Sequence, residues 1–288
     1  MPGSTTAKEQ AEGYCFALVR EGDKDRFLAS LFAPEELRAH LLALYAFNIE
    51  LARIRDVVDE PAAGEIRLQW WSDAIDSVYS GDMPGHPVIR ALAPAVERGS
   101  LPKASLQNMI EARRFDFYDD PMPTLNQLEG YLGETAAALI QMSALVLDKE
   151  RAQQCAEAAG LAGVAMGITG LLRLLPLHRS RGQCYVPAEM LAQQDLMPAH
   201  LISGRPEDAL ARVLSNLRNI AVDRLGRARA KSRTIAPEIF AAFLPVALTS
   251  IYLARLSQSG AAGLSRVVEV SQLKRQWRLY WSDRRKMF

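Results

Sequence analysis

Apolar residues recur every three or four positions along almost the whole chain, and proline or glycine interrupts most of these runs. Leu37, Leu41 and Leu44, for example, follow Pro34 at intervals of four and three residues. This spacing places apolar side chains on one face of an α-helix, whereas a strand would alternate apolar and polar residues. The pattern predicts an all-α protein.

The expected helices are separated by breaks that contain proline or glycine. They cover residues 34–58, 63–79, 86–98, 102–118, 124–147, 150–175, 206–231, 237–258 and 264–281. Residues 179–187 are expected to form an extended connector. Because no fixed-period repeat and no linker rich in Pro, Gly or Ser divides the chain, we expect one domain over residues 26–288. A partly flexible N-terminal segment, residues 1–25, precedes it.

The composition excludes several classes of protein. In a chain of 288 residues, a hydrophobic content of 49% is enough for a sizeable core. The 34 Lys and Arg residues nearly balance the 33 Asp and Glu residues, so no bulk positive field favours nucleic acid. Cys15, Cys155 and Cys184 form no CxxC pattern, which argues against a disulfide framework or a thiolate zinc site.

Two further features bear on location. Residues 1–12 contain no apolar run of the kind found in secretory signals, so we expect a cytoplasmic protein. The most apolar stretch, Gly160 to Leu177, is about as long as a short membrane span. It carries Arg173 and ends shortly after Pro176, which favours a buried core helix.

Five segments, in the same order along the chain, carry a resemblance to squalene and phytoene synthases. These are Leu41–Phe47, Leu68–Asp73, Ile110–Phe117, Tyr131–Ala136 and Gly163–Pro187. The resemblance implies a single helical bundle of the isoprenoid-synthase type around a central cavity. It also implies two aspartate-rich motifs that face each other across the cavity and hold Mg²⁺, which binds the diphosphate of a prenyl substrate. Hard cations of this kind require oxygen ligands.

The first aspartate motif is incomplete in this chain. Carried over without gaps from Phe47, its two leading aspartates fall on Ala52 and Arg53, and only the last falls on Asp56. A register shifted by three residues would place the motif on Arg55, Asp56 and Asp59. Both registers lose a carboxylate, and the ungapped one is preferred because an insertion would rotate the helix face.

The second motif has lost both of its aspartates. Its arginine is kept as Arg173, but Leu174 and His178 stand at the two aspartate positions. We therefore expect no bound metal and no cofactor. Asp56 and Asp59 would ligate Mg²⁺ only if metal binding were retained, and otherwise they are read as a solvated face or as partners of nearby arginines.

The resemblance also proposes roles for individual residues. If the protein is an enzyme, the catalytic candidates are Asp56, Asp59 and Arg173. The candidates for binding a phosphate or the substrate are Arg53, Arg55, Arg173, Arg181 and Tyr185. The candidates for lining the cavity are Phe47, Trp70, Phe115 and Tyr131, with Trp70 also read as a core or rim aromatic. His178 is read as a capping or hydrogen-bonding residue, with acid, base or ligand chemistry as the alternative.

Three segments are similar to a divergent branch of the family that includes the mitochondrial complex I assembly factor with a phytoene-synthase-like domain. These are Ala46–Ala52, Pro61–Trp70 and Pro176–Arg181. The likeness implies a non-catalytic protein that works with respiratory-complex subunits or assembly factors. Two alternatives stay open. One is an active farnesyl or geranylgeranyl diphosphate transferase with Mg²⁺, and the other is a module that binds a prenyl or other lipid.

The C-terminal run from Leu273 to Phe288 interleaves Trp277, Tyr280 and Trp281 with six lysines and arginines. The preferred interpretation is that the aromatic residues pack on the bundle while the charges keep the segment hydrated. The alternative is a helix at the surface of an anionic membrane. That alternative predicts a protein in peripheral contact with the inner membrane, on the matrix side in a mitochondrion.

Overall fold

The computed structural model describes residues 6–58, 60–82, 84–203, 208–259 and 263–288, and these residues form helices and connections with no strand among them. The α-helices are α1 Ala7–Gly22, α2 Lys24–Ser30, α3 Glu35–Arg53, α4 Pro61–Ser80, α5 Pro87–Gly99, α6 Lys103–Ala112, α7 Leu125–Leu132, α8 Ala138–Leu147, α9 Lys149–Ala152, α10 Ala156–Arg173, α11 Leu175–Ser180, α12 Ala188–Ala192, α13 Pro198–Ser203, α14 Asp208–Ala230, α15 Phe240–Phe243, α16 Thr249–Ser259 and α17 Gln272–Arg285. Short 3₁₀ or π segments connect them: η1 Ile54–Asp56, η2 Arg113–Phe117, η3 Gly133–Ala137, η4 Gln153–Cys155, η5 Ser232–Thr234, η6 Pro237–Ile239 and η7 Leu244–Leu248. The prediction of an all-α fold is confirmed.

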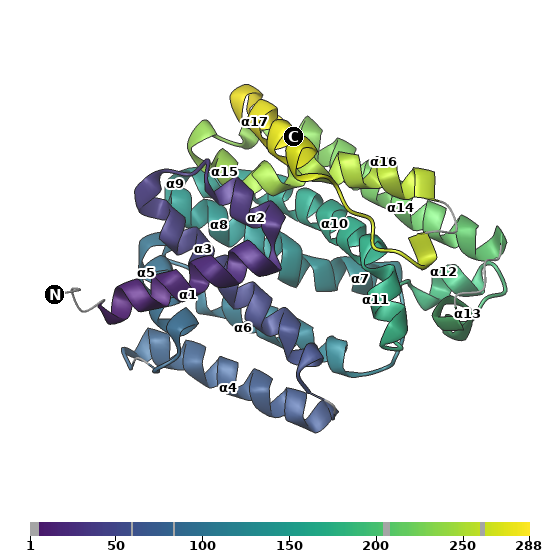
Figure 1. The fold of residues 1–288 in the computed structure, drawn as a ribbon, viewed down its shortest axis with the longest axis horizontal. Helices are drawn as coiled ribbons and strands as arrows, with labels where there is room; N and C mark the ends of the chain where they lie inside the picture. The colour runs from purple at the N-terminus through teal and green to yellow at the C-terminus, as the bar shows by residue number, and fades with distance from the viewer. Residues whose placement is uncertain (1–5, 59, 83, 204–207, 260–262) are drawn as a thin grey trace.

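The helices form one bundle with α3 and α10 in its interior. Helix α10 packs against α14, α8 and α16, and helix α3 packs against α1, α5 and α8. Figure 1 shows α4 along one edge of the bundle and α17 along the opposite edge. Both α3 and α10 carry the remains of an aspartate motif at their C-terminal ends, so the packing of these two helices sets the geometry of the region between them.

A close helix contact depends on Gly163 of α10. A Cβ atom at this position would lie within 3.0 Å of the backbone of Ala137 in the π-helical segment η3. Gly160, one turn earlier in α10, has open space where a Cβ would be. A side chain at position 163 would therefore clash with η3, whereas a side chain at position 160 would not, although both positions lie on the same helix.

We expect the substitution Gly163→Ala to lower the free energy of unfolding by about 2 kcal/mol, because overpacking forces two backbones apart. Urea denaturation measures the change. The matched control Gly160→Ala should be neutral or stabilise the protein by up to about 1 kcal/mol, since alanine is the better helix former. Equal effects at the two positions would contradict the role assigned to the close contact.

The helix boundaries differ from the predicted ones in several places, and the predicted helix over 150–175 is divided into α9, η4 and α10. The predicted helix over 124–147 is interrupted by η3, and the one over 237–258 is divided into η6, α15, η7 and α16. The predicted helix over 264–281 begins only at Gln272. The expected connector over 179–187 starts with the last two residues of α11.

The periodicity did not predict two helices near the N-terminus: α1 lies within residues 1–25, and α2 begins at Lys24 and continues to Ser30. Helix α1 begins at a capping box between Thr6 and Glu9. Its buried residues, Ala11, Cys15, Leu18 and Val19, belong to the same core as the rest of the bundle. The expected division of the chain at residue 25 remains a prediction, and α1 packs as part of the bundle.

Among the residues that the structure describes, three helical stretches are long and apolar enough to cross a membrane by length and composition: 125–147, 149–173 and 237–259. Between 56% and 72% of the most apolar 18-residue window in each stretch is buried inside the fold. The run over 160–177, expected to be a core helix, overlaps the second stretch. Its residues Ala162, Ala165 and Ile168 are fully buried, so packing inside the bundle accounts for their apolar character.

Candidate functional site

A cavity of about 810 Å³ opens between α2, the end of α3, α10 and α11. Apolar residues of its wall include Ile49, Leu132, Met166 and Leu171. The cations of the wall are Lys24, Arg26, Arg53, Arg55, Arg113, Arg173, Arg181 and Arg275, and the anions are Glu21, Asp23, Asp25, Asp56, Asp116 and Glu269. Cations therefore outnumber carboxylates, which makes the wall attractive to an anion.

A buried polar cluster around Asp116 occupies one wall of the cavity. The Asp116 side chain is 8% exposed and that of Arg113 is 14% exposed, with 3.3 Å between Oδ2 and Nη1. Tyr185 donates its hydroxyl to Asp116 Oδ1 at 2.6 Å, and Tyr131 donates to the same oxygen at 2.9 Å. This carboxylate is thus charge-balanced and hydrogen-bonded on both oxygens, as a buried carboxylate must be.

The cluster extends across the bundle through Arg113 and Gln183. Arg113 donates to Asn48 Oδ1 of α3 at 3.1 Å and to the Tyr131 hydroxyl at 2.9 Å. Gln183 donates its amide to the backbone oxygen of Asp116 at 2.8 Å. These bonds join α3, η2, α7 and the segment after α11, so the cluster fixes the relative positions of four parts of the wall.

Burial changes the acid–base behaviour of the two tyrosines. It raises the pKa of Tyr185 well above its usual value, and the nearby Asp116 carboxylate adds to the effect. Burial also raises the pKa of Tyr131. Both phenols therefore remain neutral donors at physiological pH. Both hydroxyl hydrogens are donated to Asp116, which leaves neither phenol free to donate a hydrogen bond to a ligand.

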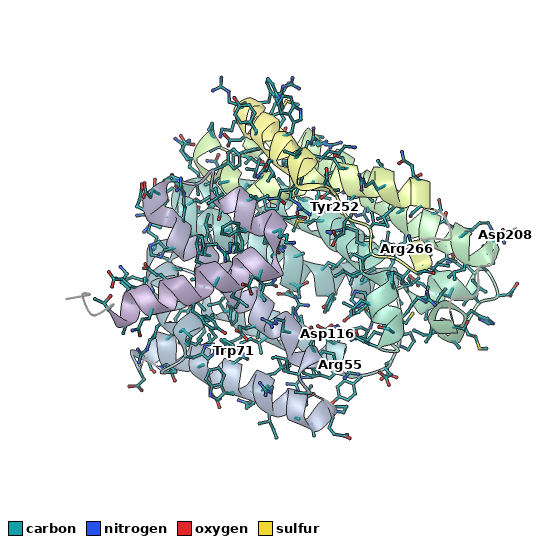
Figure 2. The ribbon with its side chains drawn as sticks, viewed as in Figure 1. Arg55, Trp71, Asp116, Asp208, Tyr252 and Arg266 are labelled. Carbon is teal, nitrogen blue, oxygen red and sulfur yellow. The ribbon has the colours of Figure 1, made fainter. Side chains whose placement is uncertain are left out.

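The carboxylate that remains of the first motif pairs with an arginine from the other side of the cavity. Asp56 Oδ1 lies 2.7 Å from Arg181 Nη2. Asp56 belongs to η1 at the end of α3, and Arg181 follows α11. The bond thus spans the two walls that carry the aspartate motifs. Figure 2 shows Arg55, the neighbour of Asp56, on the same side of the molecule as Asp116.

The Arg55 guanidinium group makes few strong hydrogen bonds or ion pairs within the described residues. Its Nε atom is buried without a hydrogen-bond partner. Its nearest carboxylate is Asp119 at 3.9 Å, and Asp119 is largely exposed. Arg53 is exposed and makes no ion pair within 4 Å to any carboxylate in the described part of the chain. These two guanidinium groups can therefore accept an anion without breaking a strong internal bond.

A second ionic cluster lies on the opposite wall, around Asp25 of α2. Arg275 Nε approaches Asp25 Oδ1 to 2.5 Å, and Arg173 Nη1 lies 3.8 Å from Oδ2. Tyr252 donates its hydroxyl to Asp25 at 2.8 Å, and the Arg173 guanidinium carbon lies 3.5 Å from the centre of the Tyr252 ring. Burial raises the pKa of Asp25 above its usual value, and the two arginines only partly oppose this shift. In Figure 2, Tyr252 lies on the side of the cavity nearer α17, and Asp116 lies on the side nearer α4.

His178, at a position of a lost aspartate, is held as a neutral ring. Both of its ring nitrogens are buried without a hydrogen-bond partner. Its ring packs edge-on to Tyr185, with 4.7 Å between the ring centres. Burial lowers the pKa of His178 to about 4. The neutral ring lines the cavity and supplies no positive charge to it at neutral pH.

The residues predicted to line the cavity are distributed between three environments. Tyr131 borders the cavity. Phe115 lies behind it and packs against Tyr131 and Tyr185. Phe47 is fully buried against Trp71, and Trp70 is 44% exposed, so neither borders the cavity. Phe47 points into the packed side of α3, and Trp70 lies on the outer face of α4.

The phosphate-binding candidates Arg53, Arg55, Arg173, Arg181 and Tyr185 all border the cavity. Their roles stay predictions. The sequence reasoning missed the partners that hold them: Asp25, Arg113, Asp116, Gln183, Tyr252 and Arg275. Asp116 lies in the segment Ile110–Phe117 that carried the family resemblance, which was an available signal. Asp25 and Tyr252 belong to no motif, and only the fold brings them together.

The side chains of the cavity do not fit a Mg²⁺ cluster. Among the described residues, no three His, Cys, Asp or Glu side chains lie close enough to share a metal ion. Asp56 is engaged by Arg181, Asp116 by Arg113, and Asp25 by two arginines. Asp59, the other candidate ligand, lies outside the described residues. The expectation of a protein without a cofactor remains a prediction.

Comparison with solved structures defines the class of fold. A dehydrosqualene synthase in complex with a ligand matches 97% of this chain and 97% of its own, with a TM-score of 0.80 and 20% identity. The squalene synthase HpnC from Alicyclobacillus acidocaldarius matches 88% of this chain and 95% of its own, with a TM-score of 0.75 and 21% identity. The fold is that of the isoprenoid synthases, a helical bundle around a cavity.

Residues 19–285 match the family of squalene/phytoene synthases, and the chain belongs to that family. The synthases that give the family its name are prenyl transferases that normally use Mg²⁺. The complex I assembly factor 6 of Bos taurus is 30% identical over 89% of this chain and 77% of its own length. The phytoene synthase of Rhodobacter capsulatus is 28% identical over 73% of this chain and 62% of its own length.

Proposed function

We propose that this protein acts in the assembly of respiratory complex I or of a similar membrane complex, and that it does not transfer prenyl groups. Relatives named as complex I assembly factor 6 support the first part, because they match a larger share of the chain than the relatives named as phytoene synthases do. The proposed partners are subunits or other assembly factors of that complex. The proposed location is at the membrane that carries it.

The ion pair between Asp56 and Arg181 is the main support for the proposal that the protein does not transfer prenyl groups. In a prenyl transferase, metal ions between two acidic walls neutralise the diphosphate as it leaves. In this chain an arginine from one wall already neutralises the carboxylate that remains on the other. Leu174 and His178 supply no carboxylate to the second wall. The two walls are therefore bridged by the protein's own guanidinium group.

A turnover assay tests the absence of catalysis. The purified protein is incubated with farnesyl or geranylgeranyl diphosphate and Mg²⁺, and released diphosphate is measured. We expect no release above that of a sample without protein. Release that disappears in the variant Asp56→Ala would instead establish the transferase alternative, because it would show that the remaining motif carboxylate supports chemistry.

A complementation experiment tests the role in assembly. Deletion of the gene is expected to lower the amount of assembled complex I, measured on native gels, and the wild-type gene should restore it. The variant Asp56→Asn should restore it as well, since assembly needs the fold and not a metal ligand. Normal complex I in the deletion strain, or failure of Asp56→Asn at a normal protein level, contradicts the proposal.

The cavity supports a second candidate function, the binding of a prenyl phosphate or other anionic lipid without chemistry. Its apolar wall suits a hydrocarbon chain, and Arg53 and Arg55 are available to an anion. Farnesyl phosphate should then raise the melting temperature in the presence of EDTA, and the double substitution Arg53→Gln and Arg55→Gln should abolish the shift. A shift that requires Mg²⁺ would count against metal-free binding.

A further inference from the structure

Helix α17 lies on the outer edge of the bundle (Figure 1), and a stripe of large apolar side chains is exposed along it. The stripe consists of Leu273, Trp277, Tyr280 and Trp281. These side chains are 79%, 66%, 47% and 38% exposed. Such large apolar side chains rarely gather on a surface unless it contacts another molecule. The interpretation preferred from the sequence, in which the aromatic residues pack on the bundle, does not match these exposures.

The stripe lies opposite the buried face of the same helix. Leu273, Trp277 and Tyr280 follow one another at intervals of four and three residues, which places them on one side of a helix. The buried residues of α17, Arg275, Leu279 and Ser282, lie on the other side. The rings of Trp277 and Trp281 touch edge to face, with 5.6 Å between their centres, so the aromatic residues form one continuous surface.

The helix is fixed to the bundle near both ends, which holds the stripe in place. Near its start, Arg275 pairs with Asp25 and donates to the Tyr252 hydroxyl at 3.2 Å. Beyond its end, the Phe288 ring stacks on Phe243, and the Phe288 backbone oxygen accepts a bond of 2.6 Å from Arg229. The exposure of the tryptophans is therefore a property of the packed helix.

The exposed charged residues of α17 are all of one sign. Lys274, Arg284 and Arg285 are exposed beside the aromatic residues. The helix has a single acidic residue, Asp283, and its carboxylate is engaged by Lys286 at 2.5 Å. A protein partner would be expected to meet a mixture of charges, whereas the exposed charges of this helix are cations. Tryptophan and tyrosine between cations suit the interface of a membrane, where the rings enter the headgroup layer.

From this arrangement we infer that α17 docks the protein on the surface of an anionic lipid bilayer. The helix lies parallel to the membrane plane, the stripe enters the headgroup region, and Lys274, Arg284 and Arg285 contact lipid phosphates. The inference goes beyond the proposed function and does not depend on it, because binding to pure lipid requires no respiratory subunit. Docking of this kind would confine the search for a membrane-bound partner to two dimensions.

Sedimentation with vesicles tests this inference. We expect the full chain to bind vesicles of an equimolar mixture of phosphatidylcholine and phosphatidylglycerol and to bind pure phosphatidylcholine far more weakly. Trp277→Ser should weaken binding about tenfold, because a large ring no longer leaves water. Lys274→Ala with Arg284→Ala should weaken it about 25-fold, which is about 1 kcal/mol for each charge. Added salt should weaken binding of the wild type.

A control on the opposite edge of the bundle separates docking by α17 from general adhesion. Ile66 of α4 is 71% exposed, and Ile66→Ser should leave vesicle binding unchanged. No binding to the anionic vesicles, equal binding to both vesicle types, or an equal loss in Ile66→Ser would overturn the inference. So would a dimer in light scattering that Trp277→Ser dissociates, since the stripe would then be the contact between two copies of the chain.

Discussion

The substitution Asp116→Ala is expected to lower the free energy of unfolding by about 3 to 5 kcal/mol. The carboxylate is 8% exposed and faces Arg113, which is 14% exposed. Removal of one partner of a buried pair leaves the other charge without compensation, and a loss of this size is typical of such a change. Tyr131 and Tyr185 would also lose their acceptor. Denaturation by urea at neutral pH measures the difference.

Two further variants distinguish the loss of the buried pair from a general effect of losing an aspartate. Asp120 lies nearby on the surface, and Asp120→Ala should change stability by less than about 0.5 kcal/mol. The double substitution Arg113→Met and Asp116→Leu removes both charges, so it should recover a large part of the loss. A double variant that is less stable than Asp116→Ala would show that the network acts through something other than charge balance.

The fold was largely predictable because an amphipathic helix requires a local spacing of apolar residues that can be read from the sequence. Helices α4 and α14 begin and end within two residues of their predicted positions, since their apolar residues repeat at helical spacing. The segment before α17 was predicted as helix, but residues 265–271 form a turn and irregular backbone, and the helix begins only at Gln272. There the Val268 backbone oxygen accepts a bond from Arg173 of α10, a tertiary contact that has no signature in the local pattern.

Only those residues of the candidate site that occupy family motif positions were predictable from the sequence. The motif positions Arg55, Arg173 and Arg181 could be placed at the cavity because the family resemblance fixes their helices. Asp116 could not be recognised as a buried carboxylate, because its partners Tyr131 and Tyr185 lie 15 and 69 residues further along the chain. A lone aspartate beside two arginines resembles a surface charge until the fold shows what covers it.

His178 gives the protein a specific sensitivity to acid. Neither ring nitrogen has a hydrogen-bond partner, and burial lowers the pKa of His178 to about 4. A histidine in an unfolded chain has a pKa of about 6.5. Between these two values the unfolded chain binds the proton and the folded protein does not. Stability is therefore lost as the pH falls from about 6.5 towards about 4, and the penalty is absent at neutral pH.

The variant His178→Gln is expected to remove this penalty. Between neutral pH and about pH 4.5, the free energy of unfolding of the wild type should fall by about 2 to 3 kcal/mol more than that of the variant. Urea denaturation of both proteins at the two pH values measures the difference. Any pH-independent effect of losing the ring contact with Tyr185 cancels, because each protein is compared with itself. His40 and His86, whose pKa values burial also lowers, are present in both proteins and cancel as well. Parallel pH profiles for the two proteins would show that the His178 ring is protonated in the folded state as readily as in the unfolded chain.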